Sequence, residues 1–84
     1  MSRKEFEDRL EELQEKVEIW DIVVGYEALA DFRIGCFFDN DIGKWKVYEN
    51  LERGRQCVYL ETPNEEEAFD ELFTLVNFRI EVSK

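Results

Sequence analysis

The sequence predicts an α+β fold in the order α-β-β-β-α, with two helices packed on one face of a three-stranded antiparallel meander. Two observations predict this class. Apolar residues recur at helical spacing near both ends of the chain, and between those ends three short segments alternate apolar and polar side chains. With 84 residues, 44% of them hydrophobic, the chain has the length and composition of one small domain, residues 1–84.

The first helix is predicted over residues 2–19. Ser2 and Glu5 have the spacing of a capping box, in which each side chain bonds the backbone N–H of the other residue. One apolar stripe follows along this helix: Phe6, Leu10, Leu13 and Val17. Residues 20–25 lose the helical period and end at Gly25, so we expect either a short buried connection or the start of a strand there.

Three strands are predicted next, over about residues 29–38, 44–49 and 57–61. Turn-forming residues separate them at 39–43 and 50–56, and connections this short favour antiparallel neighbours. The first and third of these strands therefore lie on either side of the second.

The same alternation predicts what each face of the sheet carries. If Val58 and Leu60 face the helices, the opposite face is open and carries basic and aromatic side chains: Arg33, Phe37, Lys44, Lys46, Tyr48 and Tyr59. Some proteins that bind single-stranded RNA present such side chains on a sheet. A net charge of −10 opposes that function, so we favour a solvated face or a dimer contact.

The second helix is predicted to begin after Thr62, the expected capping residue, with Pro63 at the first helical position and Glu65 at the third. Its apolar stripe consists of Ala68, Phe69, Leu72, Phe73 and Val76. The tail, residues 78–84, fits a helix end, a short strand or a frayed terminus.

The charge balance restricts the partners. The chain has 21 acidic and 11 basic side chains, a net charge of −10 and no histidine. Such a charge repels nucleic-acid phosphates and anionic membranes and attracts basic proteins. No apolar run reaches the ~20 residues that a membrane span needs, and the first residues lack the apolar core of a signal peptide. We therefore expect a cytosolic protein that binds neither nucleic acid directly nor a membrane.

The residues that most catalytic sites need are missing. Histidine is absent, and the serines, Ser2 and Ser83, lie near the ends of the chain. Cys36 and Cys57 fall in predicted strands, where a thiol is usually a small apolar side chain, so we expect both to be reduced and unpaired. The sequence therefore predicts no enzyme, no catalytic residue and no cofactor.

One segment, Asp39-Asn40-Asp41, has the composition that opens a calcium-binding loop. Such a loop needs glycine at its sixth position and a bidentate acid at its twelfth. Here Gly43 is fifth and Asn50 is twelfth, so we predict a β-turn and no metal site.

Acidic residues are most concentrated at residues 61–71, which hold six of them and no basic residue. Compensation of the helix dipole and solubility are one explanation, and a surface complementary to a basic protein is the other. The sequence leaves both open. If a partner binds, we expect it to contact acids of the second helix and of the turn at 39–43: Asp39, Asp41, Glu66, Glu67, Asp70 and Glu71.

Four segments carry a resemblance to a known family. They read FRIGCF at 32–37, GKWKVYE at 43–49, ERG at 52–54 and EEEAFDEL at 65–72. Over residues 29–77 the chain resembles the small immunity proteins encoded beside toxins in bacterial polymorphic-toxin systems. The resemblance implies a non-catalytic inhibitor that binds one toxin domain, often a nuclease, inside the producing cell. It implies no defined site residues.

The leading prediction is therefore a cytosolic protein that inhibits a basic toxin domain through its acidic surface. Two alternatives stay open. The same chemistry suits a phage-type inhibitor of a host enzyme that handles nucleic acids. A homodimeric structural module would instead pair through the open sheet face or an edge strand, with Phe37, Tyr48 and Tyr59 in a twofold interface.

Overall fold

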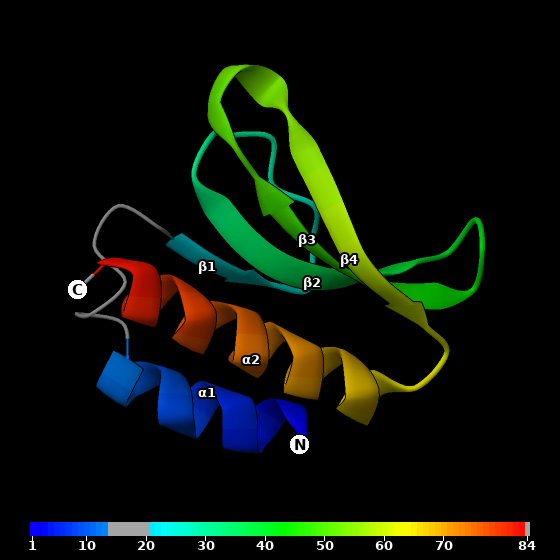
Figure 1. The fold of residues 1–84 in the computed structure, drawn as a ribbon. Coiled ribbons are helices and arrows are strands. Elements are labelled where there is room, and N and C mark those ends of the chain that lie inside the picture. The colour runs from blue at the N-terminus through cyan, green and yellow to red at the C-terminus, as the bar shows by residue number, and fades with distance from the viewer. Residues whose placement is uncertain (14–20, 84) are drawn as a thin grey trace.

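Figure 1 shows the computed structural model of the chain, which describes residues 1–13 and 21–83. The fold is α+β, as predicted, with a four-stranded mixed sheet and two helices on one face of it. The elements are α1 (Arg3–Leu13), β1 (Asp21–Val24), β2 (Arg33–Asp39), β3 (Lys44–Asn50), the short 3-10 helix η2 (Glu52–Gly54), β4 (Gln56–Thr62) and α2 (Glu65–Ser83). The strands lie side by side in chain order.

The prediction of a three-stranded antiparallel meander is wrong in one respect, because the sheet has a fourth strand. β1 lies in the segment predicted as a connection or a strand, and it runs parallel to β2, with Asp21 beside Arg33 and Val24 beside Cys36. Parallel neighbours usually need a crossover of a dozen or more residues. Residues 25–32 are sufficient here because they cross directly over the face of the sheet that the helices leave open.

The predicted antiparallel meander is confirmed for β2, β3 and β4. β2 begins at Arg33 rather than near residue 29, because Phe32 has a left-handed backbone with a φ of 58° that cannot continue a strand. In α1, the end of the predicted helix at residues 14–19 lies outside the described residues.

A β-bulge between β3 and β4 changes which side chains share a face. Val58 pairs with Tyr48, whereas Leu60 pairs with Val47, so Tyr59 is the extra residue on β4. Since neighbouring residues of β3 point to opposite faces, Val58 and Leu60 do so as well. The condition that both face the helices, from which the content of the open face was argued, is therefore not met.

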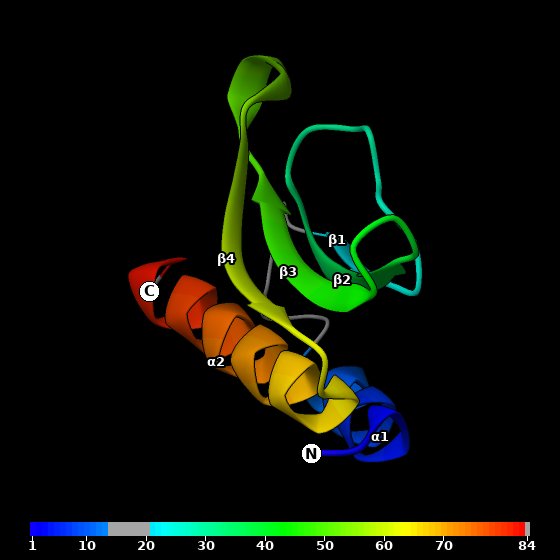
Figure 2. The same ribbon diagram turned by 90° about the vertical axis from the view of Figure 1, so that its right-hand side faces the viewer.

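The side view in Figure 2 shows the sheet above the helical layer, and the buried core residues come from both layers. The stripes predicted for both helices contribute to it: Phe6 of α1 and Ala68, Phe69, Leu72 and Val76 of α2 are buried. Their partners from the sheet are Ile34, Cys36 and Val47. Phe6 and Phe69 join the helices directly, with ring centroids 5.5 Å apart.

The opposite face of the sheet is partly covered by residues 25–32. Tyr48 has no exposed surface there, because its hydroxyl accepts a hydrogen bond from the Ala28 N–H (2.9 Å) and donates one to the Tyr26 carbonyl (3.0 Å). Gly35 makes this possible, because a Cβ at that position would lie 2.9 Å from the Tyr48 hydroxyl. The prediction that Tyr48 lies on an open face is wrong.

α2 begins later than predicted, at Glu65. Its capping residue is Asn64, whose Oδ1 accepts hydrogen bonds from the N–H groups of Glu66 (2.9 Å) and Glu67 (3.4 Å). Thr62, the predicted cap, instead fixes the preceding turn, because its hydroxyl accepts a bond from the Asn64 N–H and donates one to Glu67. The tail is helical as far as Ser83.

Candidate functional site

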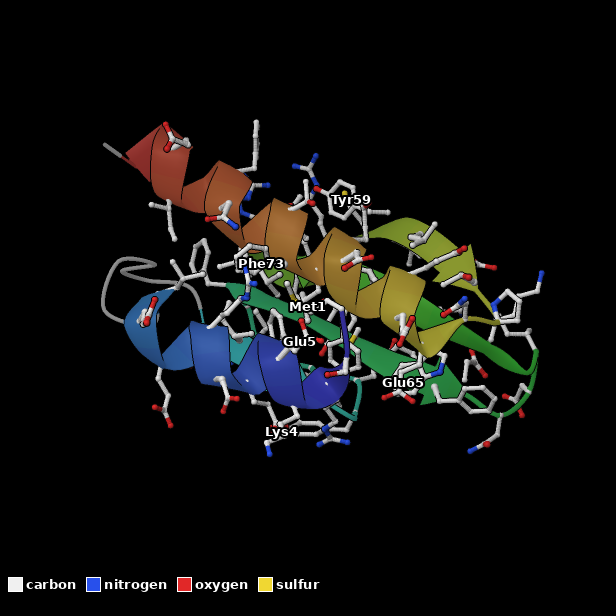
Figure 3. All side chains as sticks on the ribbon, turned by 90° about the horizontal axis from the view of Figure 1, so that it is seen from below. Met1, Lys4, Glu5, Tyr59, Glu65 and Phe73 are labelled. Carbon is white, nitrogen blue, oxygen red and sulfur yellow. The ribbon has the colours of Figure 1, made fainter. Side chains whose placement is uncertain are left out.

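The two helices begin at the same end of the molecule. α1 and α2 lie side by side and run in the same direction, so their first turns are neighbours (Figures 1 and 3). The turn between β2 and β3 lies at this end too, because Trp45 at the start of β3 pairs with Thr62, just before α2. We define the helix-start cluster as the carboxylates of Glu5, Glu65, Glu66 and Asp70.

Most of the negative charge of the described residues is on the helical layer. α1 carries five acidic and three basic side chains, and α2 carries six acidic and one basic, which gives the two helices a net charge of −7. The remaining described residues carry eight acidic and five basic side chains, a net charge of −3. The helical face is therefore the strongly acidic face.

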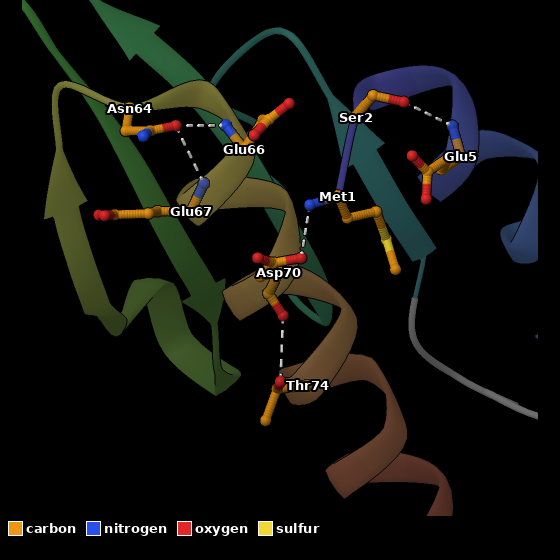
Figure 4. Close-up of polar contacts among 8 residues, drawn as sticks. All are labelled: Met1, Ser2, Glu5, Asn64, Glu66, Glu67, Asp70 and Thr74. Carbon is orange, nitrogen blue, oxygen red and sulfur yellow. Dashed lines mark hydrogen bonds and ion pairs between the residues drawn. The ribbon is translucent and has the colours of Figure 1, made fainter.

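The amino group of Met1 lies within the helix-start cluster (Figure 4). It donates a hydrogen bond to Asp70 Oδ1 at 2.7 Å, and this bond joins the start of α1 to the second turn of α2. The bond to Asp70, with the nearby charges of Glu66 and Glu5, raises the pKa of the amino group. Asp70 is thus partly neutralised, whereas no ion pair among the described residues involves Glu65 or Glu66.

The fold itself needs part of this negative charge. Two helices that run in the same direction bring the positive ends of their dipoles together, and carboxylates in the first turns offset that charge. The Ser2 hydroxyl accepts a hydrogen bond from the Glu5 N–H at 3.2 Å, which is one of the two bonds of the predicted capping box (Figure 4). Dipole compensation explains why the acids are at the helix starts but does not need all of them.

The predicted binding residues of α2 do not form one group. Glu66 and Asp70 face α1, as their interactions with the Met1 amino group show. Glu67 lies on the other side of the helix, where it accepts a hydrogen bond from Thr62 at 2.7 Å. Glu71, one turn further on, shares the side of Glu67.

Asp39 and Asp41 belong to the turn between β2 and β3. Asp39 forms an ion pair with Lys46 (3.0 Å) and accepts a hydrogen bond from the Asp41 N–H (2.9 Å), and the bond to Lys46 lowers the pKa of Asp39. The Gly43 N–H bonds the Asp39 carbonyl at 2.8 Å and closes the predicted turn. Asp39 is therefore a structural residue, whereas the side chain of Asp41 is exposed.

Apolar side chains lie beside these acids, and sequence reasoning did not select them for a site. Phe38 and Trp45 pack edge to face with ring centroids 5.8 Å apart, and Trp45 continues onto Phe69 of α2. Phe38 and Ile42 remain exposed because the turn between β2 and β3 projects beyond the start of α2 (Figure 1). The sequence feature that could have indicated this patch is that two aromatic residues, Phe38 and Trp45, flank the acidic turn at 39–43.

A buried carboxylate at the other end of α2 was also missed. Glu49 of β3 has no exposed surface; it forms an ion pair with Arg79 and accepts a hydrogen bond from the Tyr59 hydroxyl at 2.5 Å. Burial and the bond to Glu49 raise the pKa of Tyr59 to about 12. The contacts among Glu49, Arg79 and Tyr59 therefore join α2 to β3 and β4.

Two further features are the free cysteines and a hollow beside Asn50. Cys36 is buried, which raises the pKa of its thiol to about 12, and Cys57 is exposed; both are free, as predicted. Among the described residues no cluster of three or more side chains fits a metal ion. A cavity of about 230 Å³ lies between residues 27–31 and the turn after β3, where Asn50 binds the carbonyls of Ala28 and Ala30.

Within the described part of the chain, no helix has the length and apolar character needed to cross a membrane. Comparison with known proteins identifies no relative. No family model matches the chain, and no curated protein and no solved structure matches it significantly. The function is therefore argued from the residues and their arrangement.

Proposed function

We propose that this chain is a non-catalytic binding protein that inhibits a basic protein by covering its positively charged site. The concentration of negative charge on the helical layer, a net charge of −7 in α1 and α2, carries the proposal. A field of one sign on one face speeds the approach of an oppositely charged protein and orients it. The helix-start cluster is the part of this face that we expect to contact the partner.

Charge alone gives fast association, and a tight complex also needs a desolvated centre. Residues that dominate binding energy are typically large side chains in the middle of an interface, surrounded by polar ones. Phe38, which contacts α2 through Trp45, and Ile42, which follows Asp41 in the turn between β2 and β3, are exposed. We expect Phe38 and Ile42 to act as the anchors and the carboxylates to form the rim.

The partner that fits this chemistry best is a toxin domain that acts on nucleic acid. A nuclease site is basic because it binds phosphates, and carboxylates held in place by the protein would occupy the phosphate positions. The resemblance of residues 29–77 to immunity proteins supports this assignment. The surface itself would suit a host enzyme that handles nucleic acids equally well, so the identity of the captured partner decides between the two.

Affinity capture from a lysate of the source organism tests the proposal. We expect one dominant basic protein to be retained at low salt and released at high salt, because salt screens exposed charges. The isolated partner should then lose its activity when mixed with this chain at a one-to-one ratio. A partner that is acidic, or that stays bound at high salt, would contradict the electrostatic proposal.

A pair of matched variants locates the surface. Glu65→Lys with Glu66→Lys reverses two unpaired carboxylates of the helix-start cluster, and we expect at least ~10-fold weaker binding, since close interfacial charge pairs couple by about 1.5 kcal/mol or more. The control is Glu27→Lys with Glu52→Lys, which changes the net charge equally near the opposite end of β3. Equal losses in both variants would move the contact away from the helix starts.

A further inference from the structure

β4 is an edge of the sheet. Its neighbours among the described elements are β3 on one side and α2 below, so the backbone groups along its outer edge have no strand to pair with. In Figure 2 this edge runs along the free side of the sheet. Proteins usually protect such an edge with charged side chains or with a covering segment, because it is a template for another strand.

Apart from the bulge at Tyr59, which is one way in which proteins protect an edge, β4 has little of that protection. Its seven residues, Gln56–Thr62, include one charged side chain, Glu61, in a chain of which 38% is charged. Val58 and Tyr59 are exposed on the strand, and Phe78 of α2 is exposed next to Arg79, which contacts the Glu49–Tyr59 pair. Figure 3 shows Tyr59 beside α2 at this edge. The strand thus offers apolar surface together with unpaired backbone.

The charges at the two ends of β4 are opposite. Arg53 and Arg55, both exposed, precede the strand, and with Glu52 they give residues 51–55 a net charge of +1. Glu61 lies near its end, and Glu67 lies just beyond it, hydrogen-bonded to Thr62. In an antiparallel pair, the start of one strand lies beside the end of the other. Two copies of β4 paired in this way would bring the arginines of each copy to the carboxylates of the other.

We propose that a second copy of this chain binds along the β4 edge, antiparallel to it, so that the two sheets join across a twofold axis. A twofold interface requires a self-complementary surface, and a strand that is basic at one end and acidic at the other meets that requirement. This interface is separate from the helix-start cluster. Of the two homodimer alternatives left open by the sequence, the burial of Tyr48 argues against the open sheet face, and the β4 edge fits the edge strand.

The bulge at Tyr59 sets how the two strands meet. It divides β4 into Gln56–Val58 and Leu60–Thr62, and antiparallel pairing places the first segment of one copy beside the second segment of the other. The Tyr59 hydroxyl already binds Glu49, so the bulged residue contributes its ring at the axis and its hydroxyl stays within its own chain.

Sedimentation equilibrium of the purified protein over about 1 μM to about 1 mM tests the proposal. We expect a reversible dimer that Val58→Lys weakens at least ~10-fold, because a lysine on an edge strand opposes pairing. The matched control is Ile42→Lys, which places the same charge on a side chain of equal exposure (44% against 43%) outside β4. A wild-type monomer throughout, or equal losses in both variants, would overturn the proposal.

Two charge-reversal variants, measured separately and then mixed, test the same interface if Val58→Lys unfolds the chain. One variant carries Arg53→Asp and Arg55→Glu, where Asp suits the left-handed backbone of residue 53, and the other carries Glu61→Lys and Glu67→Lys. We expect each variant to be monomeric alone and the mixture to form one-to-one heterodimers. A mixture that stays monomeric, with both variants folded by circular dichroism, would contradict the interface. These measurements use the protein alone, so they are independent of the proposed inhibition.

Discussion

At the scale of single residues, Glu49 has the environment that is hardest to satisfy. A carboxylate without exposed surface needs compensation, and Arg79 and Tyr59 supply it. Removing one partner of such a pair leaves a buried charge alone, which costs much more than an exposed ion pair contributes. The sequence could not reveal the cluster, because Glu49 falls in a strand whose pattern gives no sign of α2 below it.

We therefore expect Arg79→Met to lower the free energy of unfolding by about 3 kcal/mol. The double variant Arg79→Met with Glu49→Leu should recover most of this loss, because it removes the uncompensated charge as well. Urea unfolding of the wild type, both single variants and the double variant measures the coupling. Losses that simply add would show that the two side chains do not depend on each other.

Tyr59 gives a prediction about pH. Its pKa is raised from 10.0 to about 12, so the folded state favours the neutral phenol. The stability that the neutral phenol contributes is present below pH 10 and is lost as the pH rises through 12. The difference in unfolding free energy between the wild type and Tyr59→Phe should therefore shrink over that range. A difference that stays constant from about pH 9 to about pH 12 would contradict the shifted pKa.

At the scale of elements, local patterns predicted both helices and three strands because each signal lies within its own segment. Phe6 and Leu72 follow the helical period, and Ser2 fulfils its predicted role as a cap. β1 was harder to predict because a parallel strand without a helical crossover has no local signature. The bulge at Tyr59 likewise depends on the partner strand and on Glu49 rather than on the neighbours in sequence.

The cap at the start of α2 gives a prediction about the stability of the protein. Asn64 caps the helix by accepting bonds from two backbone N–H groups, so Asn64→Ala should destabilise the protein by about 1 kcal/mol. Asn40→Ala, at an exposed residue in the turn after β2, is the control and should change stability by less than about 0.5 kcal/mol. Thermal unfolding compares the two. Equal effects would mean that the first turn of α2 does not depend on its cap.

At the scale of the whole molecule, the sequence predicted the sign and the helical location of the acidic surface, but only part of its layout. It selected Asp39 and Glu67, which the fold uses in an ion pair and a hydrogen bond, and it did not select Glu65. Which carboxylates are unpaired depends on how the helices lie against each other. That arrangement is a property of the packed core and is not visible in the spacing of acids along the chain.

Stopped-flow measurement of the association rate with the captured partner, as a function of salt, tests recognition through the starts of the helices. We expect a rate that falls steeply with salt for the wild type and is at least ~10-fold lower at low salt for Glu65→Lys with Glu66→Lys. Glu27→Lys with Glu52→Lys should keep most of the wild-type rate. A rate that is insensitive to salt, or equally slow in both variants, would contradict recognition through the starts of the helices.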